Sequence, residues 1–324
     1  MNPAERVPLG RTGLEVTRLG LGTAPLGGMY EAVTDEQGAA LVEAAWAAGL
    51  RFFDTAPLYG HGAAERRLGA GLRSRPRDEF VLSTKVGRVL RAGMPPDPGS
   101  IWVDPPPDQP VFDYSQAATL ASFSESLERL GLDRVDVLHI HDPDDHYGEA
   151  LGGAYRVLDR LRAEGRIRAV GAGMNQAAML ARFAREGRFD CFLLAGRFTL
   201  LDQSGLDDLL PLCERDGIAV IAGGAFNSGI LADPRPGAHY NYLPAAPELV
   251  ERALRLAEVC DRHGVPLAAA AIQFPLRHPA VAAVLVGARS AAELEEDVRL
   301  FGWEVPDELW ADLRATGLVR DPAG

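Results

Sequence analysis

The chain has 324 residues, of which 47% are hydrophobic and 24% charged, the composition of an ordinary globular protein with a sizeable core. Its net charge of −12 argues against nucleic acid or an anionic membrane as a partner, because both favour a basic surface. The first residues lack an apolar signal segment and no run approaches eighteen uncharged apolar residues, so we expect a cytoplasmic protein without membrane spans.

The expected elements begin with a β-hairpin and continue as alternating strands and helices. The segment VPLGRTGLEV, residues 7–16, predicts the hairpin, with its turn between Gly10 and Gly13. Apolar runs then predict eight strands, at residues 18–24, 51–56, 80–86, 134–141, 167–173, 191–197, 218–224 and 283–288.

Helices are predicted between these strands from their caps and their apolar periodicity. Thr34 and Ser115 are suited to begin helices that end at Gly49 and Gly131, and a helix from residue 148 ends at Gly165. Further helices are expected at residues 176–187, 205–217, 247–264 and 290–301. Repeated βα units without a GxGxxG turn after the first strand predict a closed (β/α)₈ barrel, one domain over residues 1–324, rather than an open sheet.

Two segments are too long to be plain connections. Residues 88–114 and 226–246 are rich in proline and leave the carboxyl ends of strands, the side on which barrel enzymes place their active sites. We expect both to form lids or pocket walls.

Three cysteines are few and far apart in the chain. Cys191, Cys213 and Cys260 have no CxxC-type spacing, so we expect reduced thiols and no metal bound through cysteine.

Lys85, in the stretch VLSTKVGR, is the only lysine, whereas the other 32 of the 33 cationic residues are arginines. A compact ammonium on a thin stem fits a narrower slot than a guanidinium does. We therefore favour a functional role for Lys85 over the alternative that the base composition of the genome alone explains the excess of arginine. Because side chains alternate along a strand, Asp54, Lys85 and His141 can point into the barrel from the ends of three successive strands. Tyr59 follows in a turn that contains proline and glycine and can bend back over the barrel mouth.

These four side chains form a set that can handle protons. An ammonium about 4 Å from a phenol oxygen would stabilise the phenolate by about 4 kcal/mol at an effective dielectric constant of 20. This corresponds to about three pKa units before desolvation opposes it, so the sequence predicts that Tyr59 exchanges a proton near neutral pH. Asp54 would hold the ammonium of Lys85 in place, and His141 would hydrogen-bond a polar substrate oxygen.

The motifs FDTAPLYGHG, STK and DVLHIHDPD, in this order, resemble those of the aldo-keto reductase superfamily, and the resemblance extends over nearly the whole chain. The segments GLGTAPLGGMY, AGMNQ and LLAGRFTLLDQ are most similar to the branch of sugar and pyridoxal dehydrogenases. The resemblance implies hydride transfer to or from a nicotinamide. It also implies that Tyr59 is the general acid or base, that Lys85 and Asp54 tune it, and that His141 orients the carbonyl.

The same resemblance implies where a dinucleotide would bind. The nicotinamide would lie across the barrel mouth near Thr23 and Asp54. Its carboxamide would lie against Met174 or Asn175, of which only Asn175 has a side-chain donor. Gly223 stands where many relatives have a tyrosine that stacks on the ring.

The remaining cofactor contacts would come from the last two barrel loops. Stacking would pass to Phe226 or be weak. The pyrophosphate and adenosine contacts implied are Asn227, Ser228, Gly229, Gly287, Arg289, Glu296 and Asp297. Glu293 stands where NADP-dependent relatives place an arginine against the 2′-phosphate, although Arg289 is close enough to compensate. NAD is therefore favoured, NADP is the alternative, and oxidation is the expected direction in the cell.

The resemblance implies a small sugar or aldehyde as the substrate, and favours an aldose oxidised at C1 to its lactone. Met29, Tyr30 and Trp102 lie in candidate lid loops and can line a pocket, although packing under a loop explains them as well. Arg197 has two interpretations, a substrate contact or an ion pair with a loop carboxylate. Neither the sugar nor the oligomeric state follows from the sequence.

Three other interpretations stay open. His139 and His141 form an HxH pair that could hold zinc or iron in a metal-dependent barrel hydrolase, although His139 is more typical of a core histidine with its hydrogen bonds satisfied. A regulatory subunit that senses the cofactor without catalysis could retain the same four residues. A lyase that forms a Schiff base on Lys85 needs an uncharged amine, which the neighbouring Asp54 opposes.

Overall fold

Eight parallel strands close into a barrel in the computed structural model, which describes residues 1–241 and 243–322. Residue 242 of the predicted loop 226–246 and the last two residues of the predicted domain lie outside the described residues. The barrel strands are β3 (Leu19–Gly22), β4 (Phe52–Asp54), β5 (Val81–Val86), β8 (Val137–His141), β9 (Ala169–Met174), β10 (Cys191–Ala195), β11 (Ala219–Gly223) and β14 (Val281–Gly287). Each pairs with the next, and β14 pairs with β3, so the predicted (β/α)₈ fold and all eight strands are confirmed.

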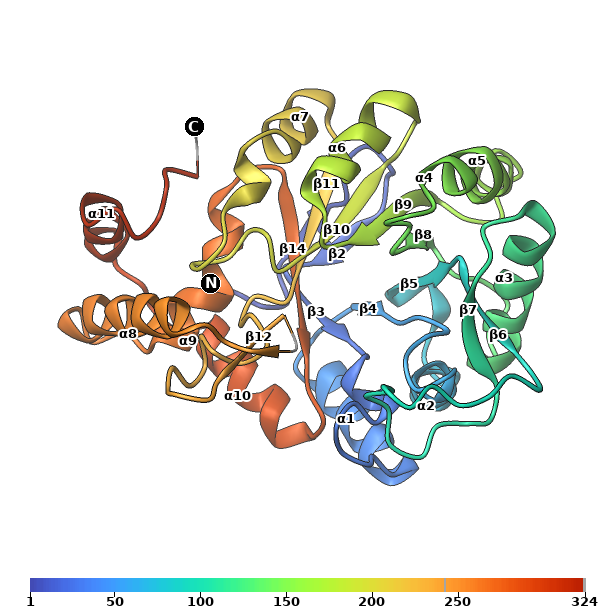
Figure 1. Ribbon diagram of the computed structural model, residues 1–324, viewed down its shortest axis with the longest axis horizontal. Helices are drawn as coiled ribbons and strands as arrows, with labels where there is room; N and C mark the ends of the chain where they lie inside the picture. The colour runs from blue at the N-terminus through green and yellow to red at the C-terminus, as the bar shows by residue number, and fades with distance from the viewer. Residues whose placement is uncertain (242, 323–324) are drawn as a thin grey trace.

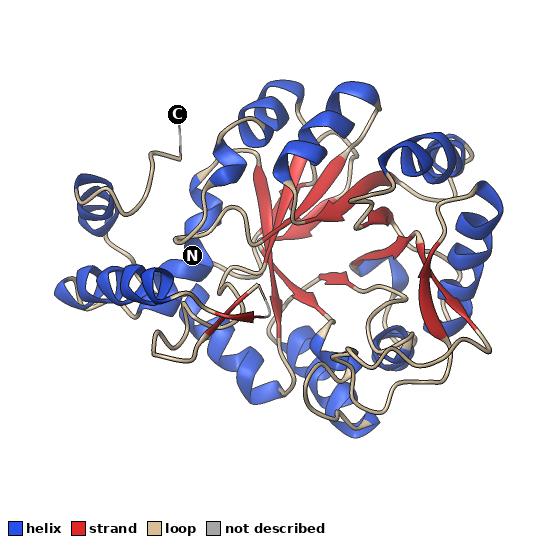
Figure 2. Cartoon of the chain, in the orientation of Figure 1, coloured by secondary structure: helices blue, strands red, loops and turns tan. Residues whose placement is uncertain are grey.

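Helices surround the strands in Figures 1 and 2. They are α1 (Asp35–Ala47), α2 (Ala63–Leu72), α3 (Gln116–Leu130), α4 (Tyr147–Glu149), α5 (Tyr155–Ala163), α6 (Ala177–Glu186), α7 (Leu209–Asp216), α8 (Pro247–Arg262), α9 (Leu267–Gln273), α10 (Ala291–Phe301) and α11 (Asp307–Ala315). The predicted caps Thr34 and Ser115 accept hydrogen bonds from the backbone N–H groups of Gln37 and Ala118. The sequence analysis missed α2, α9 and α11, none of which begins with a side-chain cap.

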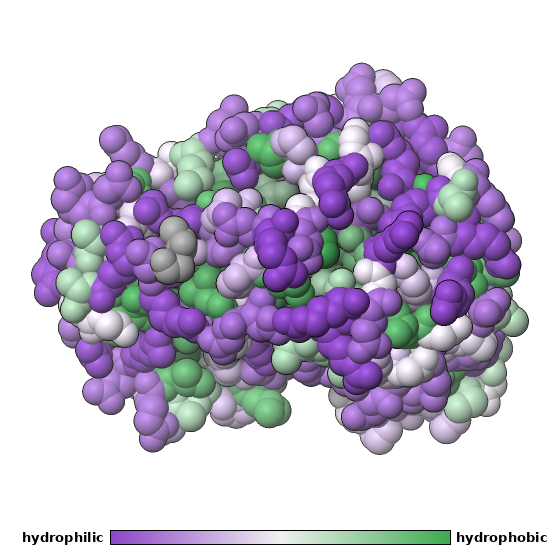
Figure 3. Space-filling view, turned by 90° about the horizontal axis from the view of Figure 1, so that it is seen from above, coloured by the Kyte–Doolittle hydropathy of each residue, from purple (hydrophilic) through white to green (hydrophobic). Residues whose placement is uncertain are grey.

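The face of the molecule seen from above in Figure 3 is largely polar. The space-filling view in Figure 3 shows mostly hydrophilic residues with scattered apolar patches between them. No helix among the described residues is long and apolar enough to cross a bilayer. The three cysteines are buried and free, as predicted.

The predicted N-terminal hairpin closes one end of the barrel. Its side chains Leu9 and Val16 pack in one buried cluster with Phe52, Val81 and Val137, which project inward from the barrel strands. The next residue along each of these three strands belongs to the other core cluster, between the barrel and the helices. The alternation that the sequence predicted is therefore present. The hairpin strands are β1 (Arg6–Pro8) and β2 (Glu15–Thr17).

Both predicted long loops contain small antiparallel hairpins, which the sequence analysis did not expect. Pro110 and Pro244 lie within these strands, and prolines normally argue against a strand. They are tolerated because each sheet has only two strands and therefore two open edges. The strands are β6 (Arg88–Arg91) with β7 (Gln109–Phe112), and β12 (His239–Tyr240) with β13 (Leu243–Pro244). Figure 1 shows β6 and β7 at the right of the barrel and β12 left of its centre.

Strand β9 makes room for two large polar side chains inside the barrel. A Cβ on Gly171 would lie 2.1 Å from Nδ1 of His139, and one on Gly173 would lie 3.6 Å from Cε of Lys85. His139 is fully buried, but neither of its ring nitrogens has a hydrogen-bond partner among the described residues. The prediction that His139 is a core residue is therefore confirmed, but the prediction that its hydrogen bonds are satisfied is wrong, because the glycine opposite offers space but no polar group.

We expect Gly171→Ala to destabilise the fold by about 1–3 kcal/mol, because its methyl group would overlap the His139 ring in a close-packed interior. Urea unfolding measures this cost. Gly152→Ala is the matched control, since its Cβ would meet no atom within 4 Å, and it should be neutral or stabilising. A cost at Gly171 that persists unchanged in a His139→Ala background would contradict this explanation.

Candidate active site

A buried ion pair lies at the carboxyl ends of β4 and β5. Nζ of Lys85 donates to Oδ2 of Asp54 at 2.5 Å and to the carbonyl oxygen of Thr55 at 2.9 Å. The hydroxyl of Ser83 donates to Oδ1 of the same carboxylate at 2.6 Å. Asp54 and Lys85 are only 2% and 1% exposed. Both carboxylate oxygens are thus engaged within the protein, which leaves the ammonium charged and fixed in position.

Tyr59 is placed above this pair by a close approach between two glycines. The turn Pro25–Gly27 packs directly on the backbone after Tyr59, and a Cβ on Gly60 would lie 2.1 Å from the carbonyl oxygen of Gly27. Gly60 also has φ +56°, which favours glycine. The phenol ring consequently lies over Lys85, with Nζ 4.8 Å from the ring centroid.

His141, at the end of β8, completes the group of four. Its ring makes an edge contact with Tyr59 at 5.8 Å between centroids, and its carbonyl oxygen accepts a hydrogen bond from the Tyr114 hydroxyl at 2.6 Å. Nδ1 is buried without a partner in the described part of the chain, whereas Nε2 lies 3.6 Å from Oδ2 of Asp142. We infer that the proton resides on Nε2, because an N–H at Nδ1 would be buried without an acceptor.

Burial, rather than the neighbouring ammonium, dominates the titration of Tyr59. Desolvation raises the pKa of Tyr59 to about 12, and Lys85 only partly opposes it. The predicted shift towards neutral pH is therefore wrong in sign. Burial also opposes the charge on Lys85, but Asp54 and Tyr59 outweigh it, so the pKa of Lys85 is raised and the ammonium persists.

Both histidines of the HxH pair are neutral at physiological pH. Burial, and after it the charge of Lys85, lowers the pKa of His139 to about 3 and that of His141 well below its ordinary value. The HxH pair lacks further ligands, because no group of three or more His, Cys, Asp or Glu residues within 1–241 and 243–322 is arranged to hold a metal ion. Nothing in this geometry favours the metal-dependent hydrolase.

A cavity of about 1210 Å³ extends from Tyr59 along the carboxyl ends of the strands to the start of α10. All the residues that the family resemblance assigned to the cofactor line it: Thr23, Asp54, Asn175, Phe226, Asn227, Ser228, Gly229, Gly287, Arg289, Glu296 and Asp297. Met29 and Tyr30 line it as well, whereas Trp102 and Arg197 do not. The sequence analysis missed the wall formed by Pro266–Ala268, which carries no polar motif.

The cavity offers polar groups suited to a dinucleotide. Oγ1 of Thr23 and Oδ1 of Asn227 are buried without partners in the described residues. Asn227, Ser228 and Gly229 have φ of +47°, +60° and +99°, a run of left-handed backbone that is unusual for side chains other than glycine. Such strain is typical of ligand-binding loops. These residues fit a bound nicotinamide dinucleotide.

The structure bears on two choices that the sequence left open, the residue that would face the carboxamide and the residue that would stack on the nicotinamide ring. Met174 is 1% exposed and belongs to the core, whereas Asn175 lines the cavity, so only Asn175 can face a carboxamide. Gly223 and Phe226 both line the cavity, and Phe226 is the half-buried aromatic side chain of the β11 loop there.

The far end of the cavity is rich in carboxylates. Arg289 contacts two of them, Glu31 at 3.0 Å and Glu293 at 3.2 Å, and Glu293 also accepts from its backbone N–H at 2.9 Å. Arg299 pairs with Glu296 at 2.5 Å. Burial, reinforced by Glu293 and Glu296, raises the pKa of Asp297 to about 7. Every arginine at this end therefore already has an anionic partner. The sequence analysis missed Glu31, which is 258 residues from Arg289.

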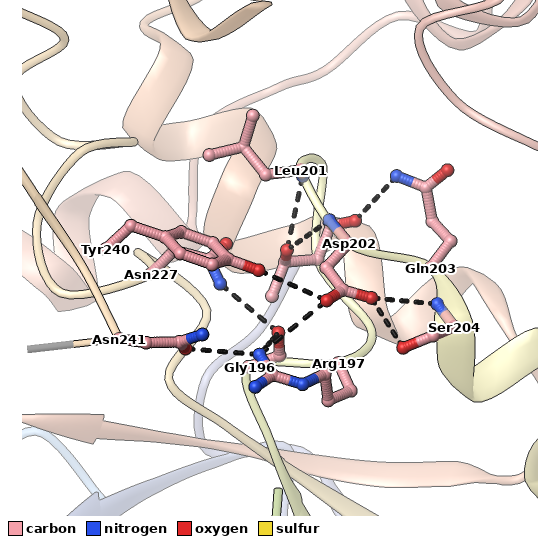
Figure 4. Close-up of polar contacts among 10 residues, drawn as sticks. Gly196, Arg197, Leu201, Asp202, Gln203, Ser204, Asn227, Tyr240 and Asn241 are labelled. Atoms are coloured by element: carbon pink, nitrogen blue, oxygen red, sulfur yellow. Dashed lines mark hydrogen bonds and ion pairs between the residues drawn. The ribbon is translucent and has the colours of Figure 1, made fainter. Parts of the chain in front are cut away.

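Arg197 lies beyond the end of β10, although the sequence placed it within the strand. Its guanidinium contacts Asp202 at 3.6 Å and Oδ1 of Asn241 at 3.1 Å, and the Tyr240 hydroxyl donates to Asp202 at 3.1 Å (Figure 4). Asn227 joins this network through Nδ2, which donates to the carbonyl oxygen of Gly196 at 3.2 Å. Of the two interpretations, the structure shows the ion pair, and the network ties the β12 hairpin to the loop after β10.

Met29 and Trp102 join two loops over the barrel mouth. They form an antiparallel bridge, and the Trp102 ring lies 6.1 Å from that of Tyr59. Tyr30 is 54% exposed, and its backbone N–H donates to the carbonyl oxygen of Ile101. The two loops thus form one wall beside the four polar residues.

A closed (β/α)₈ barrel with these side chains beside a large cavity defines a barrel enzyme equipped for proton transfer at a carbonyl or alcohol. The model of the aldo/keto reductase family matches residues 18–317. The chain belongs to this family, and it is an NAD(P)-dependent oxidoreductase.

Known relatives are similar over nearly the full length. The chain is 45% identical to pyridoxal 4-dehydrogenase of Microbacterium luteolum, with 98% of this chain and 99% of that protein covered. It is 42% identical to D-threo-aldose 1-dehydrogenase of a Pseudomonas species, with 96% and 97% covered. Among solved structures, an aldo-keto reductase of Bacillus halodurans matches the fold with a TM-score of 0.76 at 22% identity, over 99% and 98% of the two chains.

We expect the folded protein to lose stability as the pH falls below about 6.5, because the unfolded chain protonates its histidines there while His139, with a pKa of about 3, stays neutral. His139→Leu should reduce the slope of the unfolding free energy by up to about 1.4 kcal/mol per pH unit. Urea unfolding between about pH 7 and pH 5 measures both slopes. Equal slopes in the two proteins would show that His139 becomes protonated in the folded state.

Proposed function

We propose that the chain acts as a single domain that uses NAD to oxidise a small polyhydroxylated substrate, preferably an aldose at C1 to its lactone. The observation that carries this proposal is the stack of Asp54, Lys85 and Tyr59 beside a neutral His141 at the mouth of the cavity. The similarity to an aldose 1-dehydrogenase and a pyridoxal 4-dehydrogenase supports the substrate class.

In this proposal the four side chains divide the work on the substrate oxygen. Nε2–H of His141 donates a hydrogen bond that orients the C1 oxygen, while Tyr59 exchanges the hydroxyl proton. In this direction the phenolate of Tyr59 accepts the proton, so Lys85 stabilises the phenolate before the proton arrives, and Asp54 keeps the ammonium in place. A bound nicotinamide would supply the hydride acceptor for the hydrogen on C1.

The residues that would hold the dinucleotide follow from the cavity. Thr23 and Asn175 would contact the nicotinamide half, Asn227 and its left-handed neighbours the pyrophosphate, and the start of α10 the adenosine. Trp102 and Met29 would close the substrate side. Arg197 would support the β12 hairpin from outside the cavity rather than contact the substrate.

The preference for NAD over NADP rests on the carboxylates at the adenosine end. A 2′-phosphate would bring about two negative charges next to Glu31, Glu293, Glu296 and Asp297. Arg289 is the cation best placed to receive it, but two carboxylates already neutralise that guanidinium. Repulsion of this kind excludes one cofactor without improving the contacts of the other.

Tyr59→Phe should lower kcat for aldose oxidation by at least about a thousandfold, because it removes the group that exchanges the proton. Cofactor affinity, measured by fluorescence titration with NADH, should change little. In the unsubstituted enzyme kcat/KM should rise with pH from neutral into the alkaline range, because a phenol with a pKa of about 12 is protonated throughout it.

Tyr114→Phe is the matched control, since it removes a phenol hydroxyl that bonds only to backbone carbonyls. It should retain the alkaline rise. Unchanged turnover in Tyr59→Phe, or a rate that is flat from neutral to alkaline pH, would refute the role of Tyr59.

The double variant Glu31→Gln with Glu293→Gln should shift the ratio of kcat/KM for NAD to that for NADP towards NADP by at least about tenfold, because it frees the Arg289 guanidinium. Initial rates with both cofactors at one aldose concentration give the ratio. Glu295→Gln, on the same helix but outside the cavity, removes one carboxylate charge and should leave the ratio unaltered. An unaltered ratio in the double variant would show that Glu31 and Glu293 do not set cofactor choice.

A further inference from the structure

A second cavity of about 400 Å³ lies beside the four polar residues, on the side away from the adenosine end. It is lined by Arg88, Phe112, Asp142, Asp144, Asp145, His146, Asn175 and Gln176. Asn175 lines the large cavity too, so the two spaces adjoin at the end of β9.

Asp142 connects this cavity to His141. The residue has φ +42°, in the left-handed region that an aspartate rarely adopts. Its carbonyl oxygen and that of His141 both accept the Tyr114 hydroxyl, at 2.9 and 2.6 Å. Nη1 of Arg88 then fixes the carboxylate at 2.9 Å. As a result Oδ2 lies 3.6 Å from Nε2 of His141, which is 5% exposed and has no closer acceptor among the described residues.

Because Nε2 donates to no described residue, a ligand atom can lie between the histidine and Asp142, which lines the second cavity. A distance of 3.6 Å is beyond a hydrogen bond, so Asp142 does not satisfy this N–H group. An oxygen seated between them could accept from Nε2, and a hydroxyl there could also donate to the carboxylate. A reacting C1 oxygen at this point would direct the rest of the substrate into the second cavity.

The lining of the second cavity suits hydroxyl groups. Asp144 and Asp145 offer acceptors, and Asn175 and Gln176 offer both donors and acceptors, so that vicinal hydroxyls can be matched in pairs. Phe112 offers an aromatic face, which Arg88 covers on one side at 4.6 Å from the centroid. The same lining disfavours anions. Its three aspartates exceed its single arginine, and that arginine is already paired with Asp142.

We propose that the second cavity binds the hydroxyl-bearing end of the substrate, and that Asp142, Asp144 and Asp145 make the enzyme selective for uncharged sugars and aldehydes over their phosphate esters. This inference rests on the proposed function and adds its substrate class. A terminal phosphate would enter a pocket whose only cation is neutralised, and like charges in contact reduce affinity strongly.

The test compares two pairs of substrates in which the second member carries a phosphate on its terminal hydroxyl, D-arabinose with D-arabinose 5-phosphate and pyridoxal with pyridoxal 5′-phosphate. Formation of NADH gives kcat/KM for each. We expect the free compound of at least one pair to exceed its phosphate ester by at least about a hundredfold, mainly through KM.

Two variants assign that ratio to the second cavity. Asp144→Lys should reduce the ratio by at least about tenfold by improving the phosphate ester, and Asp144→Asn should reduce it less. Asp133→Lys is the matched control, because Asp133 is exposed near the amino-terminal end of β8, opposite the active site, and should leave the ratio unchanged.

The outcomes separate this inference from the proposed function. If the enzyme oxidises neither free arabinose nor free pyridoxal, both the proposed function and the inference are refuted. Turnover of free and phosphorylated substrates at similar kcat/KM leaves the oxidoreductase function intact and refutes the selectivity. A hundredfold ratio that Asp144→Lys leaves unchanged refutes the assignment to the second cavity.

Discussion

The site depends on the buried ion pair between Lys85 and Asp54. Removing either partner would leave an uncompensated charge inside the barrel and lower the free energy of unfolding by about 3–5 kcal/mol. Each of the two side chains therefore requires the other. The pair is satisfied by the Thr55 carbonyl and the Ser83 hydroxyl, which come from the same two strands. The stem of the only lysine passes Gly173 of β9, two strands away, where a Cβ would lie 3.6 Å from Cε of Lys85. A guanidinium is wider than an ammonium and suits this buried position less well, which is consistent with a lysine in a chain whose other cationic residues are arginines.

The same burial that fixes the ion pair sets the protonation of its neighbours. Tyr59, His139 and His141 are all neutral at physiological pH, because desolvation exceeds the Coulomb effect of one ammonium. Desolvation of Tyr59 outweighs the effect of the ammonium, so the predicted titration of this phenol near neutrality is wrong. The protein instead provides a protonated phenol and a neutral imidazole N–H, both of which can donate to a carbonyl oxygen, and an ammonium that stabilises the phenolate when the proton leaves.

Sequence periodicity predicted the barrel well because each strand and its inward face are determined locally. Asp54, Lys85 and His141 fall at strand ends whose alternation is readable, so their convergence could be expected before the structure. Tyr59 needed the turn held by Gly27 and Gly60, a contact between segments about thirty residues apart. Helices α2, α9 and α11 and the hairpins of the long loops were not predicted. The pairing of Glu31 with Arg289 was not predicted either, because it joins residues distant in sequence.

The two proposed selectivities, for NAD over NADP and for unphosphorylated over phosphorylated substrates, have the same cause, which is the pairing of the cations near both cavities with carboxylates. Lys85, the buried cation at the centre of the site, forms an ion pair with Asp54. Arg88 at the second cavity and Arg289 and Arg299 at the large cavity are also paired with carboxylates. The adenosine end and the second cavity are therefore both poor places for an additional phosphate. Both proposals therefore favour the ligands with the fewest phosphates, NAD together with an unphosphorylated sugar or aldehyde. The net charge of −12 argues against nucleic acid for the same reason, and the same repulsion acts on phosphate groups of a cofactor or substrate at the barrel mouth.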